Sequence, residues 1–137
     1  YLASPLEPFD LLAENLAFHR DRLAQPLAAD VAHAPIMRTV HVARDDAGAA
    51  RVFAGLEAET RRLPPGRLPK ALARAAEGAT EDRVIVGTRD AVADRIAAYR
   101  ERLGMDLLIA RSEVPGADAA QQRESLEALA GICREAA

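Results

Sequence analysis

The sequence predicts an α/β fold in which parallel strands alternate with amphipathic helices. Two observations carry this prediction: three short apolar runs are rich in β-branched residues, and apolar residues recur at helical spacing between those runs. Strands joined through helices by short loops are parallel, with right-handed crossovers. The pattern therefore favours either a doubly wound sheet or part of a barrel. The 137 residues fall well short of the ~250 of a closed eight-stranded βα barrel.

The first half of the chain predicts a helix, a strand and a second helix. The first helix is expected to begin at Pro5, within a capping-box pattern at residues 4–7, with Pro8 as a second possible start, and to end at Pro26. Its buried face should carry Leu12, Leu16, His19 and Leu23. Residues 35–43 are rich in β-branched side chains and alternate only partly, which predicts a central parallel strand buried on both faces. Asp45 or Asp46 can cap the next helix. The apolar face of that helix carries Val52, Leu56 and Leu63.

Residues 61–82 differ in character from the rest of the chain. They contain three prolines, few large apolar residues and a surplus of basic side chains. We expect an insertion that leaves the main fold and is the most mobile part of the chain. The basic side chains predict a solvated charged loop, with binding of a nicotinamide phosphate or an acidic partner as the alternative.

Regular order resumes with a short strand at residues 83–87. Thr88 is a good N-cap, and Gly104 stands where a left-handed residue ends a helix. Between them, one helical face carries Val92, Ile96, Tyr99 and Leu103. Residues 106–111 predict another strand, and residues 114–116 its exit loop. The last helix would place Gln122, Leu126, Leu129 and Cys133 on one side.

The composition argues against several functional classes. A formal charge of -3 and a pI near 5.6 give no basic surface for a nucleic acid or an anionic membrane. No apolar run is long enough to cross a membrane and no signal peptide is recognisable, so we expect a cytoplasmic protein. Cys133 is the only cysteine, which excludes an internal disulfide and argues against a thiolate zinc site. Its helical spacing predicts a buried core thiol.

Several stretches, taken together, resemble the luciferase-like monooxygenases, a family of flavin-dependent oxidoreductases. The run that begins Val-Ile-Val-Gly-Thr at residue 84 resembles the penultimate βα unit of that family, and the run after Gly104 resembles its final strand. The resembling stretches, in chain order, are residues 2–8, 35–40, 84–96, 104–111 and 114–116. Two positions depart from the family pattern, which commonly has proline where Arg89 stands and methionine where Ala117 stands.

The resemblance implies that residues 1–137 form one partial domain, the C-terminal part of a (β/α)8 TIM barrel that is incomplete on its own. Family members use reduced flavin mononucleotide (FMN) or a deazaflavin, many of them with dioxygen, to oxidise small organic substrates. Because the chain begins with Tyr1 rather than methionine, we expect an upstream part. The isolated chain should lack most of the flavin contacts and be inactive until the missing N-terminal half of the barrel is supplied.

Open strand edges also predict self-association of the isolated chain. A non-catalytic partial barrel that serves as a binding or assembly module is the alternative to the enzyme.

Active-site groups of such barrels lie on loops at the carboxyl ends of strands. His41 lies near such an end and could act as an acid, a base or a hydrogen-bond donor to a flavin; a histidine satisfied inside the barrel is the alternative. Arg111 could hold a phosphate or an anionic substrate group, with Ser112 as a nearby hydroxyl, although an arginine that ends a strand more often forms an ordinary surface ion pair. His19 and His33 are expected to be structural or exposed.

Overall fold

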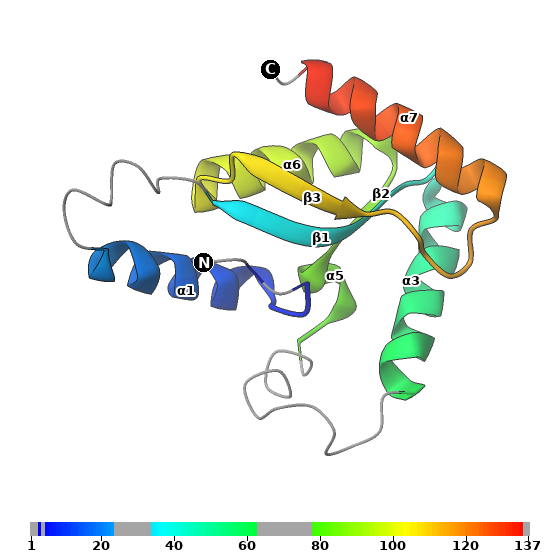
Figure 1. Ribbon diagram of the computed structural model, residues 1–137. Coiled ribbons are helices and arrows are strands. Elements are labelled where there is room, and N and C mark those ends of the chain that lie inside the picture. The colour runs from blue at the N-terminus through cyan, green and yellow to red at the C-terminus, as the bar shows by residue number, and fades with distance from the viewer. Residues whose placement is uncertain (1–2, 4, 24–33, 63–77, 136–137) are drawn as a thin grey trace.

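The computed structural model describes residues 3, 5–23, 34–62 and 78–135 (Figure 1). In chain order its elements are α1 (Phe9–Arg22), β1 (Pro35–Val42), α3 (Asp46–Arg62), α5 (Thr80–Arg83), β2 (Val84–Gly87), α6 (Arg89–Leu103), β3 (Leu107–Arg111) and α7 (Ala119–Glu135). The three strands lie at the three predicted ranges, so the alternation of strands with helices is confirmed. No helix among the described residues is long and apolar enough to cross a membrane.

The strands form one open, parallel sheet in the order β2-β1-β3. β1 is the central strand, as predicted. Its Thr39 lies opposite Val84 of β2 on one side and opposite Arg111 of β3 on the other. In a (β/α)8 barrel each strand neighbours the next one along the chain, so β3 would pair with β2. Here β3 pairs with β1, which is the strand arrangement of a doubly wound sheet.

One face of the sheet carries the hydrophobic core. Successive strand residues point to opposite faces, and Ile36, Val40 and Val42 of β1 are buried in one cluster with Ile85 of β2. Helices α1, α6 and α7 supply most of the rest of this cluster, and Ala3, Ala34 and Met105 complete it. The predicted face of α6 is confirmed, because its four members are all buried: Val92, Ile96, Tyr99 and Leu103. Gly104 ends α6 in the left-handed conformation, at φ 66°, as predicted.

α3 lies over the opposite face of the sheet, where its Leu56 shares a cavity with Thr39 and Val84. On this face Met37 and Thr39 of β1 are only half-buried. The prediction that the strand is buried on both faces is therefore wrong for most of its length. The strand order explains why helices cover both faces of the sheet. The chain moves across the sheet in one direction from β1 to β2 and in the opposite direction from β2 to β3. Crossovers of the same hand then lie on opposite faces.

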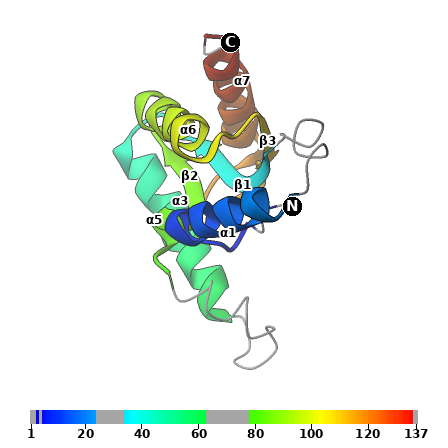
Figure 2. The same ribbon diagram turned by 90° about the vertical axis from the view of Figure 1, so that its left-hand side faces the viewer.

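The core encloses a buried arginine that the sequence pattern did not reveal. Arg38 of β1 is 0% exposed. Its Nε donates to the Tyr99 hydroxyl at 2.9 Å, and its Nη2 donates to the backbone oxygen of Glu7 at 3.0 Å. The Tyr99 ring meets the Phe9 ring edge to face, with centroids 4.8 Å apart. A buried guanidinium is tolerated only when its donors are used. The groups that use the donors of Arg38 come from α6 and from the residues just before α1, so these contacts hold both helices against β1. Figure 2 views this part of the molecule with α1 toward the reader.

The buried face of α7 differs from the predicted one. Ser125, Leu129 and Ile132 are buried, whereas Leu126 is 45% exposed and Cys133 is exposed. The prediction of a buried Cys133 thiol is therefore wrong. The observed rotation of the helix brings the Ser125 hydroxyl to β1, where its Oγ accepts a hydrogen bond from the Val42 backbone N–H at 2.8 Å.

Most of the insertion predicted at residues 61–82 lies outside the described residues, which resume at residue 78. Its two ends are helical, because α3 continues to Arg62 and α5 begins at Thr80. His33 and Leu63 also lie outside the described residues.

Candidate functional site

A crevice of about 140 Å³ lies at the carboxyl end of the sheet, between the ends of β1 and β3. It is lined by residues 41–45, by Gly48, Arg51 and Val52 of α3, by residues 116–117, and by Gln121 and Glu124 of α7. Figure 1 shows the starts of α3 and α7 near each other at this end of the sheet. We call this site the carboxyl-end crevice.

The carboxyl-end crevice lies where the chain leaves two neighbouring strands toward opposite faces. After β1 the chain enters α3, which packs near Thr39 on one face, and after β3 it enters α7, which joins the core on the other face. In open α/β sheets, loops that diverge in this way leave a cleft outside the carboxyl ends of the strands, where ligands bind. The topology therefore makes this crevice the candidate functional site.

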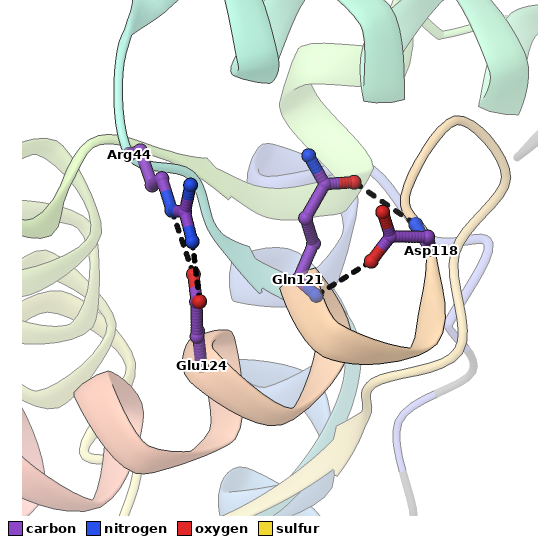
Figure 3. Close-up of polar contacts among 4 residues, drawn as sticks. All are labelled: Arg44, Asp118, Gln121 and Glu124. Carbon is purple, nitrogen blue, oxygen red and sulfur yellow. Dashed lines mark hydrogen bonds and ion pairs between the residues drawn. The ribbon is translucent and has the colours of Figure 1, made fainter.

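Side-chain caps fix the two helix starts that border the crevice. Asp45 Oδ1 accepts a hydrogen bond from the Gly48 N–H at 2.7 Å, which confirms one of the two predicted caps. At the start of α7, Asp118 Oδ1 accepts from the Gln121 N–H and Gln121 Oε1 accepts from the Asp118 N–H, both at 2.9 Å (Figure 3). This is a reciprocal capping box. It was not predicted, although an aspartate followed three residues later by a glutamine is the sequence signal of such a box.

The loop after β3 packs directly on the backbone of α3. Gly116 has φ 82°, and a Cβ there would lie 2.9 Å from the Arg51 backbone oxygen. A Cβ on Gly55 of α3 would lie 2.9 Å from the Pro115 ring. Glycine at both positions therefore permits the close approach that forms one wall of the crevice.

An ion pair joins the two sides of the crevice. Arg44 Nε donates to Glu124 Oε2 at 2.7 Å, and Arg44 Nη2 donates to Glu124 Oε1 (Figure 3). The hydrogen bonds from Arg44 lower the pKa of Glu124, and those to Glu124 raise the pKa of Arg44. The contact is bidentate, which fixes the relative orientation of the β1 loop and α7. Because both side chains are exposed, its effect on stability is small.

His41 lies at the inner end of the crevice, at the end of the central strand. The residue is 3% exposed, and its Nδ1 is buried without a hydrogen-bond partner among the described residues. Burial lowers the pKa of the imidazole below its ordinary value of 6.5, so His41 is neutral at pH 7. A neutral imidazole carries one donor and one acceptor nitrogen. A ligand atom that pairs with Nδ1 would remove an unsatisfied polar group, which typically costs about 1–3 kcal/mol.

The charges that line the crevice are balanced. Arg44 and Arg51 are opposed by Asp45 and Glu124, and His41 adds no charge while it is neutral. The site therefore suits a polar group that hydrogen-bonds to an imidazole better than it suits a multiply charged anion.

Arg111 and Ser112, the other predicted site residues, lie apart from His41. Arg111 ends β3 and is exposed, and it lines two cavities on the α3 side of the sheet together with Glu59. Ser112 lines the second of these cavities. Neither residue lines the carboxyl-end crevice. The structure thus places the three predicted residues at one end of the sheet but in different cavities.

Among the described residues, no group of three or more histidine, cysteine, aspartate or glutamate side chains could hold a metal ion. Comparison of the chain with protein-family models, with curated proteins and with solved structures finds no match.

Proposed function

We propose that the chain is part of a cytoplasmic, flavin-dependent oxidoreductase that resembles the luciferase-like monooxygenases and acts on a small organic substrate. The observation that carries this proposal is the buried, unpaired Nδ1 of His41 beneath the carboxyl-end crevice. An unsatisfied polar atom that persists at a ligand-binding position is best explained by a ligand that pairs with it. The resemblance supplies the class of ligand, FMN or a deazaflavin.

The residues of this chain fit one edge of a flavin. Sites for small molecules enclose ~300–1,000 Å³, whereas the crevice encloses about 140 Å³. His41 and the loop at residues 43–45 would hold that edge, and the remaining contacts would come from strands outside this chain. A bound flavin supplies the redox chemistry, while the protein orients it and excludes water. His41 would offer a hydrogen bond from a neutral ring held rigidly by the end of β1.

The proposed enzyme also carries the finer prediction of a (β/α)8 barrel, of which this chain would be the C-terminal part. In that barrel β3 would pair with β2. The pairing of β3 with β1 must therefore be exchanged when the missing N-terminal strands are supplied. The present edge strands, β2 and β3, are the places where such strands would add.

Titration with FMN tests the flavin proposal on this chain. We expect weak binding, with a dissociation constant above about 0.1 mM, that shifts the NMR signals of the His41 ring. Substitution His41→Gln should weaken binding several-fold, whereas the matched control His19→Gln, on α1, should not. An unchanged His41 signal at saturating FMN would refute the site. Tight binding would instead refute the idea that most of the flavin site lies elsewhere.

A binding or assembly module is the second candidate function, and the strand order favours it. The order β2-β1-β3 lets three strands share one core without a barrel, and edge strand β3 presents Leu107 at 54% exposure. We expect the chain to self-associate through this edge. Light scattering at micromolar concentration should show a lower mass for Leu107→Lys than for the matched variant Leu126→Lys on α7. A wild-type monomer at all concentrations would contradict the module and its self-association.

A further inference from the structure

A second cavity lies on the α3 side of the sheet, separate from the carboxyl-end crevice, and encloses about 390 Å³. Its floor is a row across the sheet, because Thr39 of β1 lies between Val84 of β2 and Arg111 of β3. Leu56 of α3 lines one wall. We call it the α3-side cavity. Its volume falls within the range of small-molecule sites, ~300–1,000 Å³.

A buried cation lines the inner part of this cavity. Arg83, the last residue of α5, is 4% exposed. Its Nε donates to the Ala79 oxygen at 3.4 Å and its Nη2 to the Thr80 hydroxyl at 3.3 Å. Both distances exceed the usual 2.7–3.2 Å of such hydrogen bonds. A guanidinium has five N–H donors, so these two long contacts satisfy it poorly.

No carboxylate among the described residues compensates the charge of Arg83 at close range. Within the described ranges it takes part in no ion pair, and burial lowers its pKa although Asp82 and Glu81 raise it from a distance. An arginine remains charged at neutral pH. A buried charge without a partner is strongly unfavourable, so the inner end of the cavity is short of one anionic group.

The outer rim has a different character. Arg111, Glu59 and Glu113 line the cavity and are exposed, so water screens all three and the two carboxylates do not offset Arg83. The inner walls combine the hydroxyls of Thr39 and Thr80 with apolar surface from Leu56 and Val84. This combination of a buried cation, nearby hydroxyls and an apolar wall suits an oxyanion on a compact organic molecule.

We propose that the α3-side cavity binds a small organic anion, with its carboxylate or phosphate group at Arg83 and its apolar part against Leu56 and Val84. The guanidinium of Arg83 offers the oxyanion paired donors, and Thr80 adds a hydroxyl. This inference rests on the cavity and its charge alone. It is independent of the flavin proposal, because the two sites share no lining residue.

Isothermal titration of the full chain tests the proposal with four probes: hexanoate, hexyl phosphate, inorganic phosphate and hexan-1-ol. We expect hexanoate, hexyl phosphate or both to bind at or below about 10 mM, while hexan-1-ol does not. Inorganic phosphate should bind more weakly than hexyl phosphate, because it lacks the apolar part. Whichever of hexanoate and hexyl phosphate binds with the higher affinity identifies the head group that the cavity prefers. Binding of neither, or equal binding of hexan-1-ol, would overturn the proposal.

Variants locate the binding. Arg83→Met should weaken anion binding at least about tenfold, and Arg83→Lys, which keeps the charge without the paired donors, should weaken it less. Arg111→Gln at the exposed rim should lose a few-fold at most. The matched control Arg61→Gln removes an exposed arginine of α3 that pairs with Glu57 and should bind as the wild type does. Equal affinity in wild type and Arg83→Lys, together with no loss in Arg83→Met, would overturn the proposal.

The stability of the empty protein gives a second, independent readout. If Arg83 lacks a counter-ion, Arg83→Met should unfold at the same temperature as the wild type or higher, and a bound anion should raise the unfolding temperature of the wild type only. A strongly destabilised Arg83→Met that keeps the full effect of the anion on its unfolding temperature would show that Thr80 and Ala79 are sufficient partners. That result would assign Arg83 a purely structural role and would refute the proposed anion site.

Discussion

The hydrogen bond between Ser125 and β1 gives the sharpest stability prediction. The Ala43 N–H donates to the Gly87 oxygen of β2, and successive N–H groups of a strand point to opposite sides, so the Val42 N–H faces β3. However, β3 ends at Arg111, opposite Thr39. The Val42 N–H therefore has no strand partner on that side, and the Ser125 Oγ accepts its hydrogen bond at 2.8 Å. Ser125 is 2% exposed, so water cannot readily replace it. Ser125→Ala removes one oxygen and leaves a buried donor unsatisfied.

The expected cost is about 1–3 kcal/mol, the usual penalty for a buried polar group left without a partner. For a domain of this size that corresponds to a fall of roughly 3–15 °C in the unfolding midpoint. Urea unfolding followed by circular dichroism measures the free energy of unfolding, and hydrogen exchange at the Val42 amide reports the local effect. The matched control Ser112→Ala, in a loop, should remain within about 0.5 kcal/mol of the wild type. A Ser125→Ala variant as stable as that control, with unchanged exchange at Val42, would refute the reasoning.

Three further predictions concern single side chains. Because burial lowers the pKa of His41, the unfolded chain takes up a proton near pH 6.5 that the folded chain resists. The free energy of unfolding should therefore fall as the pH drops below 6.5. Urea unfolding repeated across pH should show a shallower fall in His41→Gln. Gly116→Ala should cost about 1–3 kcal/mol by thermal unfolding, because position 116 has φ 82°. Gly131→Ala inside α7 has no such strain, and its Cβ would meet only the end of the long Arg89 side chain, at 3.2 Å, so its effect should stay within about 0.5 kcal/mol. Tyr99→Phe keeps the ring and removes the acceptor of the Arg38 Nε, so chemical denaturation should show a loss of about 1–3 kcal/mol.

Local features were predictable from the sequence because they depend on neighbours along the chain. The spacing of the α6 face, the cap at Asp45 and the stop at Gly104 are each set within a few residues. The strand order was not predictable in this way. Whether β3 pairs with β1 or with β2 depends on contacts between segments far apart in sequence, and the βα pattern is the same in a barrel and in a doubly wound sheet.

The side chains that the sequence analysis missed share a physical reason. Arg38 and Arg83 interrupt or border apolar runs, and a charged residue in such a run is normally assigned to the exposed face. The burial of Arg38 depends on a partner from another element, Tyr99 of α6, and Arg83 is buried where α5 packs against α3 and β2. α7 has two faces of similar apolar content, and either could pack on the sheet. The face that packs is the one without Cys133, and it brings the Ser125 hydroxyl to its hydrogen bond with β1. Of the predicted site residues, His41 and Arg111 both lie near the carboxyl ends of their strands, as the strand pattern predicts.

The pairing of Tyr99 with Phe9 and Arg38 also equips this protein with an internal optical probe. The chain has no tryptophan and two tyrosines, and Tyr99 is held rigidly, 0% exposed, where α1, α6 and β1 meet. A Tyr1→Phe variant leaves Tyr99 as the sole phenolic chromophore. Its near-ultraviolet dichroism then requires a fixed, asymmetric environment and its emission reports the adjacent guanidinium. Docking of α1 and α6 onto β1 can thus be timed by rapid mixing without an attached dye.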